Sequence, residues 1–257
     1  MLVEFDSVEE FARAARDTID PDPQLLDWYG YITHQEAYQK AIIGDESYVK
    51  EAEKFLNQLD VLTPETKAWK VIQSPYGGQC NIGDWLAGSP LPMRRRIRTT
   101  SEIAPVNIYV STTCSMGIKA DTMQRRGYAI LALLLKLQQI RPIQLYLLTE
   151  LHGETDGWHY QKIRVESQPL AVGVAAFALC HVGFARHLTY GYAREKDGFN
   201  GHWPSGYRQS NYVQKRAERL GLTDQDMILK EAHSNDQLVS QPVEWIKKQL
   251  KRYGGVE

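Results

Sequence analysis

The chain has 257 residues, of which 43% are hydrophobic and 24% charged, and its formal net charge is −1. This composition is typical of a soluble globular protein and argues against a largely disordered one. The longest apolar run, residues 129–135, is too short to span a bilayer, and the three cysteines are too widely spaced for a disulfide scaffold or a CxxC zinc site. We therefore expect a cytoplasmic protein without membrane contact.

Opposite charges gather in different parts of the chain. Residues 1–65 contain 15 Asp and Glu against 5 Lys and Arg, whereas residues 66–257 contain 16 Asp and Glu against 25 Lys and Arg. Either the two parts pair with each other or they have separate partners. A basic part of this kind directs attention to nucleic acid as one partner.

Three helices are expected in the acidic part. The first covers residues 7–18 and starts with the Ser-x-x-Glu pattern of a capping box. Thr33 caps the second helix, which ends at Gly44, and the third covers residues 46–59. We predict that this acidic helical N-terminal segment, residues 1–65, packs on the core.

A segment rich in Gly and Pro follows at residues 69–92. Its composition predicts a structured loop with a short strand at residues 69–73. The glycines match neither the P-loop nor the dinucleotide-binding pattern. We expect the large apolar side chains of this segment to be buried, namely those of Trp69, Tyr76, Trp85 and Leu86.

The central part alternates strands and helices. A buried strand at residues 106–111 precedes the most strongly periodic helix, residues 120–139. Further elements are strands at residues 143–151 and 158–166, the latter near an edge, and an apolar helix over residues 169–192. This order predicts an α/β core over residues 66–195, a central sheet with flanking helices.

The periodicity fades after Arg194. A long polar and aromatic loop is followed by helices predicted at residues 215–220, 224–233 and 243–253. Residues 196–257 therefore form a basic, aromatic third part. We expect all three parts to pack as one compact domain.

A cluster of hydroxyls and a thiol at the end of the strand 106–111 allows three interpretations. First, Ser111, Thr113 and Ser115 occupy the positions of the Asp-x-Ser-x-Ser metal loop of von Willebrand factor A-type domains. Because a serine replaces the aspartate, the anionic ligand is missing and the loop is a degenerate metal site. Second, Cys114 or Ser115 could be a nucleophile, although the sequence identifies no partner base. Third, the hydroxyls bond loop amides and cap the next helix, which is the interpretation we favour.

Histidines and carboxylates form no catalytic constellation in the sequence. His181 and His187 lie six residues apart on one predicted helix and therefore on different faces of it. Glu150, Glu154 and Asp156 lie at a strand end without the context of a hydrolase. We predict no catalytic residue, no metal and no cofactor.

Basic and aromatic residues form two clusters in the basic part of the chain. Cations of this kind bind phosphates, and unpaired bases stack on such rings at about 1–3 kcal/mol per base. Alternatively, the arginines pair with the acidic helices and the rings fill a core. The candidate nucleic-acid-binding residues are Arg94, Arg95, Arg96, Arg98, Trp203, Tyr207, Arg208, Tyr212, Lys215 and Arg216.

Residues 5–195 resemble a family of uncharacterised α/β proteins found mainly in phages and mobile elements. The resemblance implies a core similar to that of von Willebrand A-type or Rossmann-like proteins. At Tyr29 the chain departs from the family, in which a glycine is usual. The matching residues are Trp28, Glu36 and Ala37, the turn formed by Leu86, Ala87, Gly88 and Pro90 with Met93, and the pair Arg126 and Gly127.

The layout is also similar to that of a phage single-stranded-DNA-binding cofactor of RNA polymerase. This similarity implies recruitment of a phage RNA polymerase to promoters with exposed single strands. The leading hypothesis is a non-enzymatic phage protein of the host cytoplasm that binds single-stranded DNA and assists transcription, with homo-oligomerisation left open. The alternatives are a metal-free protein-interaction module of the von Willebrand A type and an enzyme acting at residues 111–115.

Overall fold

The computed structural model describes two compact units, formed by Met1–Leu62 with Pro105–Glu257 and by Thr63–Ala104. We call them the main unit and the small unit. These boundaries differ from the divisions at residues 65 and 195 that the sequence suggests. The described residues are 1–18, 27–59, 68–99, 105–113, 118–153, 157–198, 201–202, 218–223, 225–232 and 236–254.

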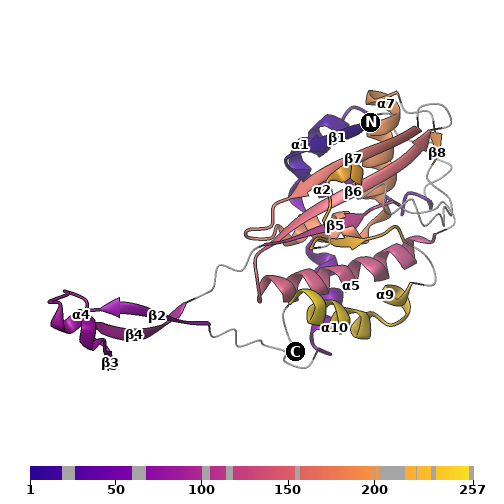
Figure 1. The fold of residues 1–257 in the computed structure, drawn as a ribbon. Helices are drawn as coiled ribbons and strands as arrows, with labels where there is room; N and C mark the ends of the chain where they lie inside the picture. The colour runs from indigo at the N-terminus through magenta and orange to yellow at the C-terminus, as the bar shows by residue number, and fades with distance from the viewer. Residues whose placement is uncertain are drawn as a thin grey trace. The chain divides into compact units, whose positions relative to one another are not determined.

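A mixed sheet organises the main unit (Figure 1), with the strand order β1-β7-β6-β5-β9 and with β8 paired to β6. β5, β6 and β9 run parallel to one another, β7 is antiparallel to β6, and β1 is parallel to β7. The strands are β1 (Leu2–Phe5), β5 (Val106–Ser111), β6 (Ile143–Gly153), β7 (Gly157–Val165), β8 (Gly201–His202) and β9 (Met227–Leu229).

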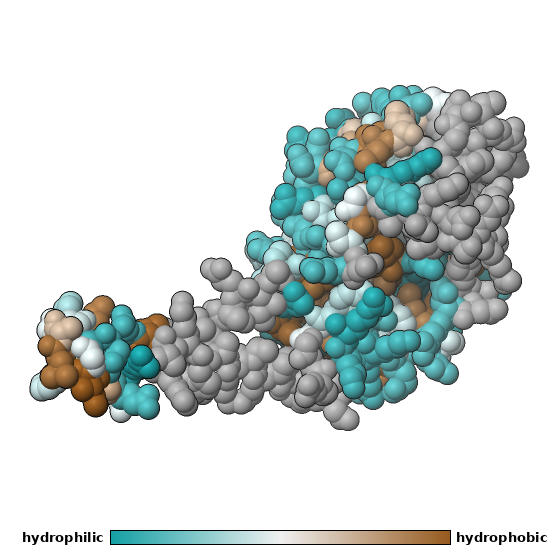
Figure 2. Space-filling view, viewed as in Figure 1, coloured by the Kyte–Doolittle hydropathy of each residue, from teal (hydrophilic) through white to brown (hydrophobic). Residues whose placement is uncertain are grey.

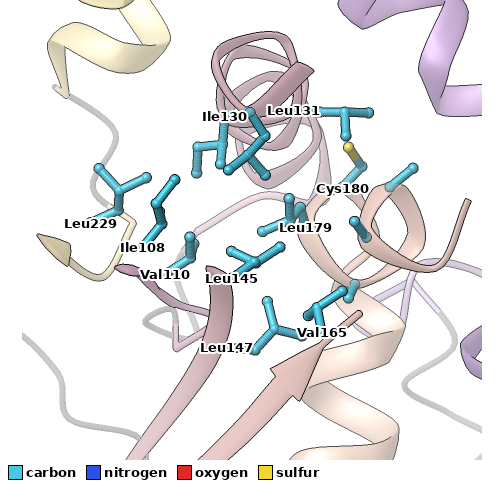
Figure 3. Close-up of a cluster of buried hydrophobic side chains, with 14 of the residues drawn as sticks. Ile108, Val110, Ile130, Leu131, Leu145, Leu147, Val165, Leu179, Cys180 and Leu229 are labelled. Carbon is cyan, nitrogen blue, oxygen red and sulfur yellow. The ribbon is translucent and has the colours of Figure 1, made fainter. Parts of the chain in front are cut away.

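Helices cover one face of this sheet. Alternate strand residues such as Ile108, Leu145 and Val165 join the apolar sides of α5 and α6 in a single core (Figure 3). The predicted α/β class is thereby confirmed. The helices are α1 (Val8–Ala15), α2 (His34–Ile43), η2 (Glu46–Tyr48), α3 (Val49–Leu56), α5 (Ala120–Gln138), α6 (Val172–Cys180), the π-helix η3 (Phe184–Thr189), α7 (Tyr190–Lys196), α9 (Gln237–Ser240) and α10 (Pro242–Tyr253).

The opposite face of the sheet is more polar. The rings of Tyr109 and Tyr146 stack with their centroids 4.8 Å apart, and the Lys162 ammonium lies 5.0 Å from the centre of the Tyr146 ring. Tyr109 packs with Leu148 and Leu220 in a cluster separate from the main core. Residues near position 220 therefore cover part of this face.

Local sequence signals position the first helices as predicted. The Ser7 hydroxyl accepts a hydrogen bond from the Glu10 amide at 3.0 Å, and Thr33 starts α2 with a complete capping box. Gly44 ends α2 with φ 88°, a conformation that favours glycine. The strand predicted near an edge is β7, which lies beside the edge strand β1.

The helix predicted over residues 224–233 is wrong, because Met227–Leu229 form the edge strand β9. A run of three apolar residues is too short for its periodicity to separate a strand from a helix. Pairing with β5 decides the conformation: Met227 and Leu229 are buried in the core beside Ile108 and Val110.

The single helix predicted over residues 169–192 is also wrong. His181 is extended (φ −108°, ψ 124°), and the chain bends by 80° between Val172–Cys180 and Phe184–Lys196. A β-carbon on Gly183 would lie 2.6 Å from the Ile32 side chain, so the bend admits a close approach of the N-terminal segment. Among the described residues no single helix is long and apolar enough to cross a membrane. The two helices of this bent pair reach the length and apolar composition of a membrane span only when they are taken together.

The Arg-Gly pair of α5 has a packing role in the main unit. A β-carbon on Gly127 would lie 2.4 Å from the carbonyl oxygen of Leu179, so glycine allows α5 and α6 to touch. Arg126 is buried, and its guanidinium donates to the carbonyl of Lys230 just after β9. The pair thus holds α5 against α6 and against the end of the edge strand.

The small unit is a three-stranded antiparallel sheet of order β2-β4-β3 with one short helix. Its elements are β2 (Ala68–Ser74), β3 (Gln79–Cys80), α4 (Ile82–Leu86) and β4 (Met93–Thr99). Gly88 ends α4 with φ 69°. Its amide donates a hydrogen bond to the backbone carbonyl of Trp85 at 3.1 Å, and the Ser89 amide donates one to the backbone carbonyl of Asp84 at 2.9 Å. This is a Schellman motif, and its need for a residue with positive φ explains the glycine of the Leu-Ala-Gly turn.

Candidate nucleic-acid interface

The central strand of the small unit, β4, carries all four predicted arginines of the first cluster. The side chains of Arg94 and Arg95 are exposed. Arg96 and Arg98 occupy positions on the same strand, but their side chains are outside the described part of the structure. The sequence did not predict β4, because four arginines within five positions conceal the strand pattern.

Exposed aromatic rings lie in the same unit. Tyr76 is 64% exposed and Trp85 62%, and the guanidinium carbon of Arg95 lies 5.1 Å from the centre of the Tyr76 ring. The expectation that Tyr76, Trp85 and Leu86 are buried is therefore wrong; Leu86 is 73% exposed. A unit as small as residues 63–104 has too little interior to enclose so many large side chains.

Hydrogen bonds fix the helix that carries Trp85 to the strands. The Asp84 carboxylate accepts a hydrogen bond from the Gln73 side chain of β2 at 3.1 Å and a second one from Asn81. Gly77 is constrained as well, because a β-carbon there would lie 2.4 Å from the carbonyl oxygen of Arg94. The rings and the cations therefore belong to one fixed framework.

Hydrophilic and hydrophobic residues lie side by side on the surface of this small unit (Figure 2). Residues 63–104 contain 6 Lys and Arg against 3 Asp and Glu. Three large aliphatic side chains are also exposed here: Ile82 (68%), Leu86 (73%) and Leu91 (40%). A surface that combines cations, rings and aliphatic groups is suited to binding a partner.

The second predicted cluster lies outside the residues that the structure describes. It consists of Trp203, Tyr207, Arg208, Tyr212, Lys215 and Arg216. The next cation along the chain, Arg219, is exposed, and its guanidinium carbon lies 6.0 Å from the centre of the Tyr160 ring of β7. The end of this basic, aromatic segment therefore lies against the sheet face that the core helices leave open.

The hydroxyl loop after β5 has a structural role in its described part. Ser111 and Thr113 are fully buried, and the Ser111 hydroxyl accepts a hydrogen bond from the Thr113 amide at 3.3 Å. The Thr113 hydroxyl accepts from the Glu150 amide at 2.8 Å, which ties the loop to β6. The helix α5 instead has Lys119 as its N-cap residue, which makes no side-chain capping hydrogen bond, so the predicted capping of α5 by the described hydroxyls is wrong. Cys114 and Ser115 lie outside the described residues.

Buried polar groups elsewhere in the main unit also serve the fold. Burial lowers the pKa of His181 to about 4, and its Nδ1 accepts a hydrogen bond from the Gly183 amide at 2.9 Å. The Arg186 guanidinium donates to the carbonyls of Trp28 and Ile118 and lies 4.7 Å from the Trp28 ring. Within the described ranges, no group of three or more His, Cys, Asp or Glu could hold a metal ion.

Comparison with known proteins identifies a family for this chain. One family model, described as a domain of unknown function (DUF7192), matches residues 1–256. No curated protein and no solved structure matches the chain.

Proposed function

The chain belongs to the DUF7192 family, and we infer from the chemistry of its small unit that it binds single-stranded DNA. One observation carries this proposal: the exposed Arg94 and Arg95 lie in the same unit as the exposed rings of Tyr76 and Trp85. The proposed binding residues are these four, on β4, on α4 and in the loop before β3. Arg95 lies beside Tyr76, whereas Arg94, the preceding residue of β4, points to the opposite face of the strand, so the DNA would contact both faces of β4.

The two kinds of side chain supply the two contacts that a single strand needs. Guanidinium groups neutralise phosphates and release counterions, which gives affinity independent of sequence. Exposed rings accept unpaired bases, which present both faces only when the strands are separated. The Arg95 guanidinium beside the Tyr76 ring brings a phosphate site and a stacking site next to each other.

Fluorescence anisotropy with a labelled oligo-dT strand, titrated with salt, tests the arginines. Arg94→Ala/Arg95→Ala should weaken binding at low salt and lower the slope of log K against log salt by about 1.4, since each phosphate contact on a single strand contributes about 0.7. The control is Arg13→Ala/Arg125→Ala, because these guanidinium-bearing side chains are 70% and 64% exposed on the main unit. The control should leave affinity and slope unchanged.

The aromatic contribution is tested separately. Tyr76→Ala and Trp85→Ala should each cost about 1–3 kcal/mol of binding free energy, while Tyr31→Ala, a 78% exposed ring of the main unit, should cost nothing. Binding of duplex DNA as tight as that of oligo-dT would argue against stacking. No measurable affinity for oligo-dT at low salt would refute the proposed function.

A second candidate function rests on the exposed aliphatic side chains. Ile82, Leu86 and Leu91 have no role in stacking bases, and their exposure favours a protein partner for the same unit. Ile82→Ser/Leu86→Ser should then abolish the capture of a protein in the presence of nuclease. It should leave oligo-dT affinity unchanged.

The partner that the sequence resemblance suggests is an RNA polymerase. We propose this partnership together with a non-enzymatic role in transcription in the host cytoplasm. It predicts that purified RNA polymerase and this protein co-elute in gel filtration after nuclease treatment. If the two elute at separate volumes while the protein still binds oligo-dT, the proposed partnership with RNA polymerase is contradicted and the proposed DNA binding is not.

A further inference from the structure

A groove of about 350 Å³ runs along the edge of the main sheet. Five consecutive residues line one side of it, Met227–Glu231, which comprise the edge strand β9 and the two residues after it. β9 pairs with β5 on its other side, and no described strand pairs with its outer edge. Figure 3 shows Leu229 on this edge strand beside Ile108 of β5. The groove therefore follows a strand whose outer side has no strand partner within the described ranges.

One face of the C-terminal helix α10 forms the other side of the groove. The lining residues are Trp245, Lys248, Gln249, Arg252 and Tyr253. Their spacing of three and four residues places them on a single stripe of the helix. Ile246 and Leu250, on another side of α10, are buried in the main core and hold the helix in place. A fixed helix face thus runs beside the strand edge.

The charged residues of the groove favour a ligand with acidic side chains. Lys230, Lys248 and Arg252 are exposed at its rim, and Glu231 and Asp236 are half-buried in its lining. The two cations of α10 stand one helical turn apart on the side opposite the strand edge. They would meet acidic side chains of a ligand whose backbone lies against β9.

We propose that this groove binds an extended acidic peptide segment of a partner protein, which adds a strand to β9. An edge strand offers backbone N–H and C=O groups in the spacing that another strand needs, and a neighbouring helix supplies the side-chain contacts. The three residues of β9 and the two lining residues after it span at most about 16 Å at about 3.3 Å per residue, so a segment of about five residues fits, with strand pairing along Met227–Leu229. Tyr253 and the small exposed part of Trp245, which is otherwise buried in the main core, supply apolar contact for alternate side chains, while Lys248 and Arg252 bind the acidic ones.

A defined probe tests the proposal in the full chain. We would titrate a fluorescein-labelled peptide of alternating Glu and Val and follow anisotropy. Lys248→Glu/Arg252→Glu should weaken binding by at least about tenfold, whereas the matched variant Lys247→Glu/Lys251→Glu should change affinity by less than about twofold. The matched pair lies on the same helix outside the groove lining and carries the same change of charge.

Three further measurements separate strand addition from simple charge attraction. A peptide of alternating Lys and Val should not bind, and a peptide in which prolines replace the valines should bind at least about tenfold more weakly, because proline has no N–H to donate. The amides of Ile228 and Leu229 should show altered hydrogen exchange when the peptide is bound. Equal weakening by both charge variants, equal affinity of the proline peptide, or no binding at about 1 mM would overturn the proposal.

The outcome is independent of the proposed DNA binding. Lys248→Glu/Arg252→Glu leaves Arg94, Arg95, Tyr76 and Trp85 in place, so its oligo-dT affinity should equal that of Lys247→Glu/Lys251→Glu. Peptide binding without DNA binding would refute only the function proposed for the small unit. DNA binding without peptide binding would refute only the proposal that the groove binds an acidic peptide.

Discussion

Gly127→Ala offers the sharpest test of how the main unit is packed. The added β-carbon would lie 2.4 Å from the carbonyl oxygen of Leu179 and 2.6 Å from the α-carbon of Cys180, whereas ordinary contact begins at 3.4 Å. The overlap of about 1 Å involves backbone atoms, which cannot rotate away as a flexible side chain could. α5 and α6 would have to separate, together with the core residues between them.

The expected magnitude follows from two opposing effects. Overpacking of a core costs about 1–3 kcal/mol, and contact with backbone places this case at the upper end. Alanine is better than glycine in a helix by about 1 kcal/mol, so the net loss should be about 2 kcal/mol. For a protein of this size, a loss of about 2 kcal/mol lowers Tm by about 4–8 °C.

Thermal unfolding followed by circular dichroism measures this effect. Gly173→Ala in α6 is the matched control, because its added β-carbon would meet neighbours no closer than 3.4 Å. The control should not lower Tm, and the helix preference of alanine, up to about 1 kcal/mol, should raise it by up to about 2–4 °C. An unchanged or raised Tm for Gly127→Ala, with no loss of Tm in the control, would refute the close approach of α5 and α6.

Three further predictions concern the Schellman turn, a buried arginine and a buried histidine. Gly88→Ala should cost the small unit about 1 kcal/mol, because φ is 69° there, and should speed hydrogen exchange in α4; Gly78→Ala, with open space around it, should not. Arg186→Lys should lower the free energy of unfolding by about 2–4 kcal/mol, since lysine cannot reach both carbonyls and also lie over the ring; an effect under about 0.5 kcal/mol in urea titration would contradict this. His181 stays neutral in the folded protein down to about pH 4, whereas in the unfolded chain it takes a proton near pH 6.5, so stability should fall as the pH drops from 7 to 5, by about 2 kcal/mol for this ring. His181→Asn should reduce that pH dependence, and an identical pH profile for both proteins would show that another group causes it.

The sequence determined those features that depend on neighbouring residues. Ser7 and Thr33 predicted the starts of α1 and α2, because a hydroxyl three residues before a Glu satisfies a free helical amide. The apolar runs predicted β5 and β6, and the long periodic pattern predicted α5, since burial of one face leaves a fixed period in the chain. These elements were sufficient to establish the α/β class.

Tertiary structure alone decided the conformation and exposure of the remaining features. Met227–Leu229 became a strand because β5 presented an edge, and His181 broke a predicted helix where Ile32 approaches Gly183. Tyr76 and Trp85 were expected inside but are exposed, because burial depends on how much chain surrounds a side chain and not on its own hydrophobicity. The cations of Arg94 and Arg95 were visible in the sequence, and only the fold placed the exposed ring of Tyr76 beside Arg95.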